Sequence, residues 1–135
     1  MSNNPTSNST GHILLVDDEP DLLAVNSKLL SVSGFEVSTT TSGQEAAKLV
    51  AREKIDLVIL DMMMPQIDGV ETLKRIRAAR SDQKVVILSG FSEGDKIAEV
   101  RQLGVLAFLK KPFESATMVK TLRDALDGKR SLDIP

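Results

Sequence analysis

The stretch LVILD, residues 57–61, decides the fold of this chain. Four consecutive apolar residues without polar alternation are typical of a strand buried on both faces, as in a parallel sheet covered by helices. Similar apolar runs occupy residues 13–16, 85–88 and 106–109. The segment 35–39 alternates instead between apolar and polar residues, which predicts an edge strand with one wetter face.

Helix signals separate these runs. Pro20 opens a segment with apolar residues at helical spacing, and Gly34 ends it. Ser42 followed by Glu45 predicts a capping box at the start of the next helix. Further helices are expected at residues 69–79, 93–102 and 114–126. The alternation predicts the α/β class: a doubly wound parallel sheet of five strands flanked by five helices. We expect the flavodoxin-like strand order 2-1-3-4-5, one of the common orders of such sheets, in which the first and third strands are neighbours.

Length and composition limit the alternatives. The 135 residues suit one domain, for which we expect the range 11–128, with a disordered tail at 1–10 and a tail or the start of a linker at 129–135. The net charge of −2 implies neither direct nucleic-acid binding nor membrane attraction. No cysteine is present, so disulfides and thiolate metal sites are excluded. There is no signal peptide and no membrane-length apolar run, so a cytoplasmic location is expected.

Carboxylates follow two of the predicted strands. Asp17 and Asp18 come directly after the first strand, and Asp61 directly after the third. Ligands of such sheets bind beyond the carboxyl ends of the strands, so we expect these side chains to converge. Like charges at 4 Å repel by about 4 kcal/mol at an effective dielectric constant of 20, and a hard divalent cation such as Mg²⁺ relieves this repulsion. Each aspartate alone also fits a turn or a helix cap.

Four motifs then carry a family resemblance. In order and spacing, LLVDDEPDLL, DLVILDMMMPQIDG, VVILSG and AFLKKPF resemble the response-regulator receiver domain of two-component signalling systems, over nearly everything from Gly11 to Gly128. The resemblance implies a cytoplasmic phosphorelay protein whose only chemistry is Mg²⁺-dependent transfer of a phosphoryl group to itself and its slow loss. It is therefore not expected to be an enzyme in the usual sense.

The resemblance also implies roles for individual residues. Asp61 matches the phospho-acceptor, and Asp17 and Asp18 match the acidic pair that positions Mg²⁺. The other matches are the metal-ligating backbone carbonyl at Met63, the phosphoryl-binding hydroxyl at Ser89, the switch aromatic at Phe108, the phosphoryl-contacting lysine at Lys111 and a proline at Pro112 that often follows a cis peptide bond. Ser89 and Phe108 are expected to move on phosphorylation.

Partners are implied in the same way. The donor would be a sensor histidine kinase or a histidine phosphotransfer protein. The output would pass through the face formed by residues 93–102, 106–109 and 114–126, to a downstream protein partner or a fused output domain. Val105 and Leu106 stand where many DNA-binding relatives carry an acidic pair, so we expect an apolar patch there and a monomer or a weak phosphorylation-linked dimer.

Other interpretations remain open from the residues. One is a degenerate receiver that serves only as a scaffold. Another is an aspartate-nucleophile phosphatase-like enzyme, which expects a second aspartate where Met63 stands, and a third is a flavodoxin-like flavin carrier. Phe108 also fits simple core packing, and His12 is interpreted as structural. The basic residues of the third helix are expected to form a solvated face: Lys74, Arg75, Arg77 and Arg80.

Overall fold

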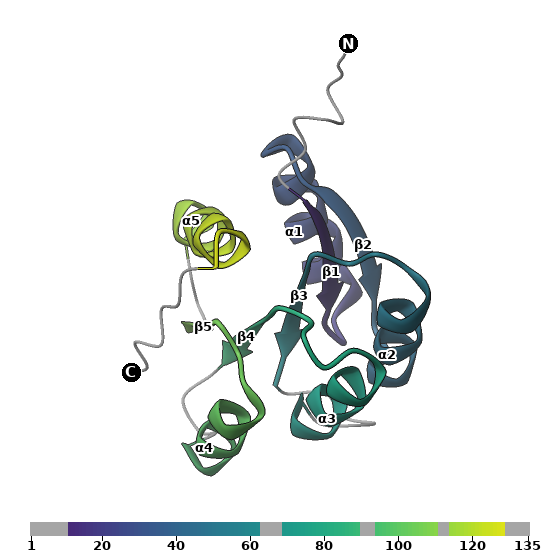
Figure 1. Cartoon of the computed structure of the whole chain (residues 1–135). Helices are drawn as coiled ribbons and strands as arrows, with labels where there is room; N and C mark the ends of the chain where they lie inside the picture. Colours follow the sequence, from purple (N-terminus) through teal and green to yellow (C-terminus); the bar gives the residue numbers. More distant parts are fainter. Residues whose placement is uncertain (1–10, 63–68, 90–93, 111–113, 129–135) are drawn as a thin grey trace.

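The computed structural model describes residues 11–62, 69–89, 94–110 and 114–128, with the side chains of residues 89 and 94–97 outside this description. One parallel sheet runs through the centre of the molecule, in the order β2-β1-β3-β4-β5 (Figure 1). This is the predicted strand order, and β2 lies at one edge as expected. The strands are β1 His12–Val16, β2 Glu36–Thr40, β3 Leu57–Asp61, β4 Val85–Ser89 and β5 Ala107–Lys110.

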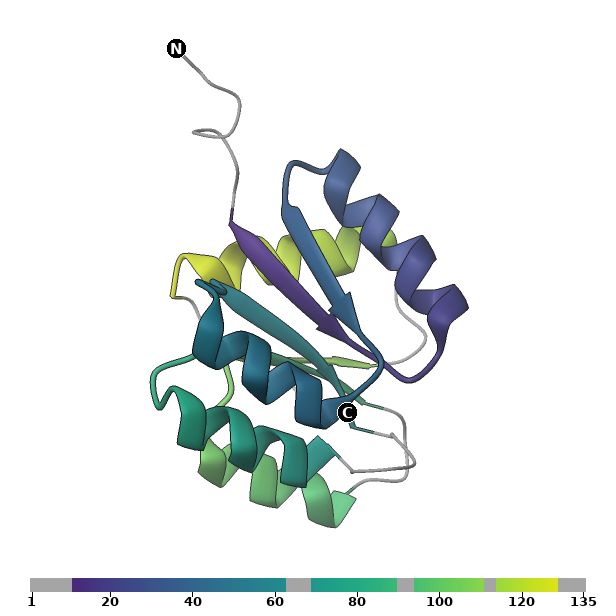
Figure 2. The ribbon, with the colours of Figure 1, turned by 90° about the vertical axis from the view of Figure 1, so that its right-hand side faces the viewer.

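Helices cover both faces of the sheet. On one side lie α1 and α5, and on the other lie α2, α3 and α4, which Figure 2 shows as a layer in front of the strands. The helices are α1 Pro20–Val32, α2 Gly43–Arg52, α3 Gly69–Ala79, α4 Gly94–Leu103 and α5 Ser115–Leu126. The doubly wound architecture is thus confirmed.

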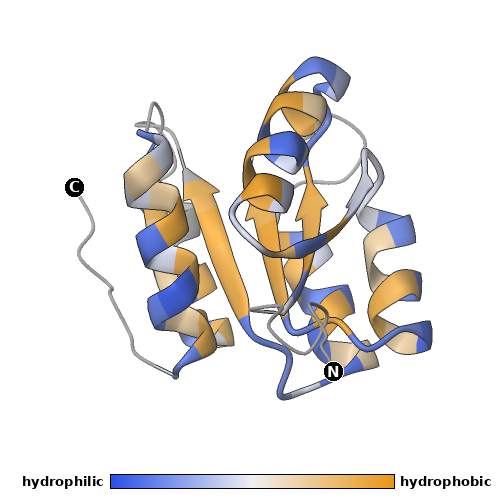
Figure 3. Ribbon diagram, turned by 90° about the horizontal axis from the view of Figure 1, so that it is seen from above, coloured by the Kyte–Doolittle hydropathy of each residue, from blue (hydrophilic) through white to orange (hydrophobic). Residues whose placement is uncertain are grey.

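The central strands are apolar on both faces because each face packs on helices. Side chains of a strand point alternately to opposite sides. Leu14 and Val16 of β1 accordingly join the core under α2, α3 and α4, whereas Ile13 and Leu15 join the core under α1 and α5. In Figure 3 the strands are coloured hydrophobic, and the helices beside them carry both hydrophobic and hydrophilic residues. The continuous apolar runs of the sequence follow from this two-sided burial.

Of the two hydrogen bonds of the predicted capping box at α2, one forms. The Ser42 hydroxyl oxygen accepts the Glu45 backbone N–H at 3.1 Å, a cap worth about 1 kcal/mol. In a complete capping box the Glu45 carboxylate would accept the Ser42 backbone N–H. Here that N–H donates instead to the Thr40 hydroxyl oxygen at 3.1 Å. The Glu45 carboxylate is paired instead with Arg52 at 3.3 Å.

The prediction of a wholly solvated basic face on α3 is wrong for two of its four residues. Lys74 and Arg75 are exposed, but Arg77 and Arg80 are half-buried. Arg80 donates to the Val50 carbonyl oxygen in the last turn of α2 at 3.1 Å, and Arg77 donates to three backbone carbonyl oxygens. Carbonyls at helix ends lack intrahelical donors, which explains why these guanidinium groups turn inward.

The expected apolar patch before β5 is also absent. Val105 is buried in the same core cluster as Val100 and Phe108, and Leu106 is half-buried against the opposite cluster. The cause is that the Leu106 backbone N–H donates to the Val85 carbonyl oxygen at 2.9 Å. The extended chain therefore begins before β5 and turns one side chain to each face of the sheet.

The predicted tails at 1–10 and 129–135 lie outside the described residues, so the domain limits 11–128 stay a prediction. Within the described ranges, no helix has the length and apolar character needed to cross a membrane.

Candidate functional site

Three carboxylates meet at the carboxyl edge of the sheet. β1 and β3 are neighbours with Val16 opposite Leu60, so the residues that follow them emerge side by side. Carboxylate oxygens of Asp17, Asp18 and Asp61 all lie within 4.8 Å of one another. We call these three residues the acidic cluster. The convergence predicted from the sequence is observed.

Asp17 is held in place by the backbone around it. It is 4% exposed, and its backbone N–H donates to the Thr40 carbonyl oxygen at 3.2 Å, which ties the end of β1 to the end of β2. One carboxylate oxygen accepts the Glu19 backbone N–H at 3.0 Å. Such a bond to the chain two residues on fixes the side chain within its own turn. Asp18, the next residue, is half-buried.

Asp61 is the last residue of β3 and is 2% exposed. It lies opposite Leu88 of β4, and the next backbone N–H, that of Met62, donates to the Leu88 carbonyl oxygen at 3.1 Å. Asp61 is therefore carried on the rigid centre of the sheet. The side chain of Met62 is fully buried in the core.

Gly69 supports the site, and sequence reasoning assigned it only to the start of a helix. Its backbone N–H donates to the Met62 carbonyl oxygen at 3.0 Å. A Cβ atom at this position would lie 2.6 Å from Met62 Cα and 2.9 Å from Met62 Sδ. The signal in the sequence is a glycine at the first position of an expected helix. Glycine has a low helix propensity, so its presence there indicates a requirement other than helix formation.

The other predicted residues are placed only in part. Ser89 ends β4, between Asp61 on β3 and Lys110 on β5, its register partner. The side chain of Ser89, and Met63, Lys111 and Pro112 entirely, lie outside the described residues. Phe108 is 8% exposed and belongs to the same core cluster as Val100 and Val105, so in this conformation it is a core residue.

The donor set fits a hard divalent cation. Within the described residues the acidic cluster offers only carboxylate oxygens, which suit Mg²⁺ or Ca²⁺ rather than a soft metal. Two of the three carboxylates are buried, where weaker solvent screening strengthens their mutual repulsion. His12 lies at the opposite edge of the sheet. Its ring nitrogens contact the Lys54 carbonyl oxygen at 3.1 Å and the Ser38 hydroxyl at 2.7 Å, which confirms its structural role.

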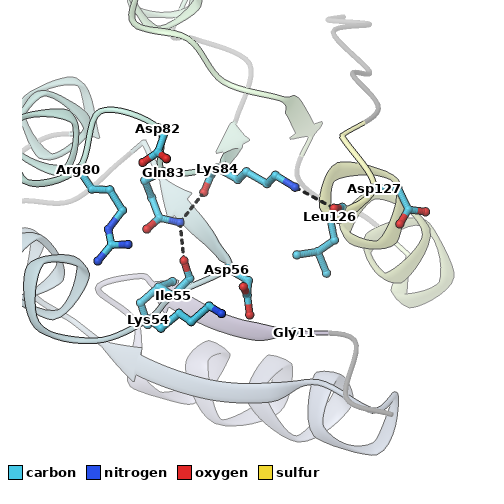
Figure 4. A pocket seen from close by; sticks show the side chains of 10 residues that line it. All are labelled: Gly11, Lys54, Ile55, Asp56, Arg80, Asp82, Gln83, Lys84, Leu126 and Asp127. Carbon is cyan, nitrogen blue, oxygen red and sulfur yellow. Dashed lines mark hydrogen bonds between the residues drawn. The ribbon is translucent and has the colours of Figure 1, made fainter. Parts of the chain in front are cut away.

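A depression of about 510 Å³ opens at that opposite edge (Figure 4). Two of its polar side chains bind backbone carbonyl groups of the protein itself. Lys84 Nζ donates to the Leu126 carbonyl oxygen of α5 at 2.8 Å, and the Gln83 side-chain amide donates to the Ile55 carbonyl oxygen at 3.0 Å. We interpret this region as a packing contact that joins the starts of β3 and β4 to the end of α5. It lies far from the acidic cluster along the strands and supplies no chemistry to it.

Comparisons with known proteins agree with this geometry. The chain matches the response regulator receiver domain family over residues 13–123. It is 35% identical over 121 residues to the transcriptional regulatory protein GlrR of Escherichia coli, covering 90% of this chain but 27% of that protein. It is 33% identical over 114 residues to sporulation initiation phosphotransferase F of Bacillus subtilis, covering 84% of this chain and 89% of that protein.

Solved structures show the same fold. A response regulator receiver domain protein from Clostridium thermocellum superimposes with a TM-score of 0.82 at 29% identity, over 87% of this chain and 95% of that one. A CheY-like receiver domain protein from Methanospirillum hungatei gives a TM-score of 0.83 at 23% identity, over 87% and 94% of the two chains. With the family match, the strand order and the acidic cluster all in agreement, this chain belongs to the response regulator receiver domains of two-component systems.

Proposed function

We propose that this receiver domain is a phospho-acceptor switch in a two-component phosphorelay, with Asp61 as the acceptor and Mg²⁺ as the cofactor. The observation that carries the proposal is the acidic cluster: three carboxylates within 4.8 Å of one another at the carboxyl edge of a parallel sheet. Sheets of this topology bind ligands at this edge, where neighbouring strands connect in opposite directions. A scaffold with no phosphorylation chemistry has no need to hold two of these carboxylates buried.

In the proposed transfer, a carboxylate oxygen of Asp61 attacks the phosphorus atom of a phosphohistidine. A P–O bond to Asp61 forms as the P–N bond breaks, and the bond's electron pair stays on the imidazole nitrogen, which then takes up a proton. Transfers of this kind depend mainly on positioning and on charge neutralisation. The placement of Asp61 on the central strand β3 supplies the positioning.

Asp17, Asp18, Asp61 and the backbone carbonyl of Met63 are the proposed ligands of Mg²⁺. When bound, the cation would offset the negative charge of the acidic cluster and of the phosphoryl group. Asp17 is already oriented by its bond to the Glu19 N–H, so little side-chain ordering remains to be done on binding. The carboxylate-only character of the described donors supports a hard cation such as Mg²⁺ rather than a soft metal.

Ser89 and Lys111 are the proposed contacts of the phosphoryl group after transfer. Their support is their place in the sheet: Ser89 ends the strand next to Asp61, and Lys111 follows Lys110, the register partner of Ser89. Phe108 and Ser89 are the proposed switch residues. Phe108 lies in the same core cluster as Val100 of α4, so a change in the ring position would be transmitted to that helix through the core.

The proposed donor is a sensor histidine kinase or a histidine phosphotransfer protein. The proposed output is a change of protein contacts on the face made by α4, β5 and α5, read by a downstream protein or a fused output domain. The chain spans about a quarter of GlrR but nearly all of the Bacillus subtilis phosphotransferase, so relatives of both lengths exist. A cytoplasmic location, a monomer or weak dimer, and the absence of direct nucleic-acid contact remain predictions.

The test is phosphorylation by a small-molecule phosphodonor with Mg²⁺, read by intact-protein mass spectrometry. Wild type is expected to gain one phosphoryl group and Asp61→Asn none. Asp56→Asn is the matched control, because Asp56 precedes the same strand at its other end and binds the His12 backbone N–H. Labelling that persists in Asp61→Asn would contradict the proposal. Turnover of a phosphate ester substrate would support the phosphatase alternative instead.

A further inference from the structure

Arg77, in the last turn of α3, is bonded to three backbone carbonyl oxygens. Its Nε donates to the Leu103 carbonyl oxygen at 3.0 Å, and its two terminal nitrogens donate to those of Gln83 and Gly104. The pKa of the Arg77 guanidinium is lowered. Burial is the main cause, and the carboxylate of Asp82 offsets part of the shift. An arginine of this kind stays charged at neutral pH, so all three are charge-assisted hydrogen bonds.

Two of the three acceptors belong to the carboxyl end of α4. Leu103 is its last residue, and Gly104 follows with a φ of +87°, the left-handed conformation in which helices commonly end. Carbonyl groups at this end have no intrahelical donors and carry partial negative charge. The Arg77 guanidinium therefore caps α4 from a neighbouring helix. The third acceptor, the Gln83 carbonyl oxygen, ties the same cap to the entrance of β4.

The attachment of α4 is weaker along the rest of its described length. Lys74 of α3 pairs with Glu99 of α4 at 3.2 Å, but both side chains are about half exposed, so the pair contributes little. Among the side chains described in α4, residues 98–103, only Val100 is buried and Leu103 is half-buried. Both lie on the Arg77 side of Glu99 along the helix.

We propose that Arg77 is a fixed pivot for α4: the helix swings about Leu103 and Gly104, and the exposed pair Lys74–Glu99 is the contact that yields. The signal that drives the swing rests on the proposed phosphorylation of Asp61, whereas the anchoring of the carboxyl end does not. The geometry suits a lever. The anchored end joins β5, while the other end, Gly94, follows the Ser89 strand end that flanks the acidic cluster.

Amide hydrogen exchange of the full chain without ligand, followed by NMR, tests the anchor. The Gly104 N–H donates to the Val100 and Arg101 carbonyl oxygens at 3.1 Å. Helix ends ordinarily fray, but here the Gly104 amide is expected to exchange more slowly than those of Ala98 and Glu99. Arg77→Met is expected to accelerate exchange at Gly104 at least about tenfold, because a charged bond to the chain is lost.

Arg75→Met is the matched control, since Arg75 lies on the same helix but pairs only with exposed Glu71 among the described residues. It is expected to leave the Gly104 amide unchanged. If Arg77→Met does not fold, Arg77→Lys takes its place. It keeps the charge but loses the planar fork, so exchange at the Gly104 amide is expected to be faster than in wild type, by less than about tenfold. Equal exchange at Gly104 in the Arg75 and Arg77 variants overturns the anchor.

Beryllofluoride with Mg²⁺ tests the swing. In wild type, amide shift changes at Ala98 and Glu99 are expected to exceed those at Leu103 and Gly104, and in Arg77→Met the changes are expected to spread to the carboxyl end. Changes in wild type that are as large at Gly104 as at Ala98 overturn the pivot. If neither wild type nor Asp61→Asn responds, the proposed phosphorylation fails, and the exchange comparison in the ligand-free protein still decides whether Arg77 anchors α4.

Discussion

The backbone N–H of Gly69 donates to the carbonyl oxygen of Met62 at 3.0 Å, and no Cβ atom fits between the two residues. The chain thus leaves β3 directly after Asp61. The first residue of α3, Gly69, packs back against Met62, the first residue after the strand. The start of α3 and the end of β3 are fastened to each other at the residue next to the proposed phospho-acceptor. A side chain at position 69 must therefore displace one or the other.

Gly69→Ala is expected to weaken Mg²⁺ binding and beryllofluoride binding at least about tenfold while lowering the free energy of unfolding by about 1–3 kcal/mol, because its Cβ would lie 2.6 Å from Met62 Cα. Gly34→Ala is the control. Its φ of +103° imposes a comparable cost of about 1–2 kcal/mol, but nothing lies within 4 Å of its Cβ. Isothermal titration and urea unfolding of both variants check this. Equal loss of Mg²⁺ affinity in the two would show a general effect of destabilisation.

Asp61→Asn is expected to raise the free energy of unfolding of the metal-free protein by about 1–2 kcal/mol, because one of three mutually repelling carboxylates is removed. The same variant should lose most of the stabilisation by Mg²⁺, which for wild type is about 2.7 kcal/mol at a hundred times the dissociation constant. Urea unfolding with and without Mg²⁺ measures both effects. Asp56→Asn, outside the acidic cluster, is expected to keep the full Mg²⁺ response. If Asp61→Asn gains as much stability from Mg²⁺ as wild type does, the metal binds elsewhere.

Val25→Asp is expected to slow phosphotransfer from a histidine-containing protein donor at least about tenfold. Val25 is 65% exposed on α1, close to the start of a helix that begins directly beyond Asp17 and Asp18, so a protein seated over the acidic cluster meets it. Val32, 75% exposed, lies about 10 Å further along the same helix. Val32→Asp is therefore the matched control and should transfer at the wild-type rate. Phosphorylation by a small donor should be unchanged in both, and equal slowing with the protein donor would argue against docking at this end of α1.

Lys84→Met is expected to lower the free energy of unfolding by about 1–2 kcal/mol, because Lys84 Nζ binds the Leu126 carbonyl oxygen at the end of α5. Lys120→Met removes an equally charged side chain that is 78% exposed and paired within α5, and should change stability by less than about 0.5 kcal/mol. Neither should alter phosphorylation of Asp61. A loss of phosphorylation in Lys84→Met would connect the opposite edge of the sheet to the site.

The sequence by itself determined the fold and the membership of the acidic cluster. Apolar runs such as residues 57–60 are continuous only because both faces of a parallel sheet are covered, so strand number and fold class could be inferred from them. Asp17, Asp18 and Asp61 could be placed together because each ends or follows a strand, and the ends of parallel strands meet at one edge. These are properties of local pattern and topology.

Only the tertiary structure decided where the polar side chains make their bonds. Arg77 and Arg80 look like members of a solvated helix face in the sequence, but they reach carbonyl oxygens of residues far along the chain. Val105 looked exposed, yet strand pairing at Leu106 turns it into the core. Acceptors of this kind are backbone groups, which every residue carries alike. Whether a carbonyl oxygen is free to accept a bond from an arginine depends on where helices end next to one another. No residue type in the sequence indicates that position.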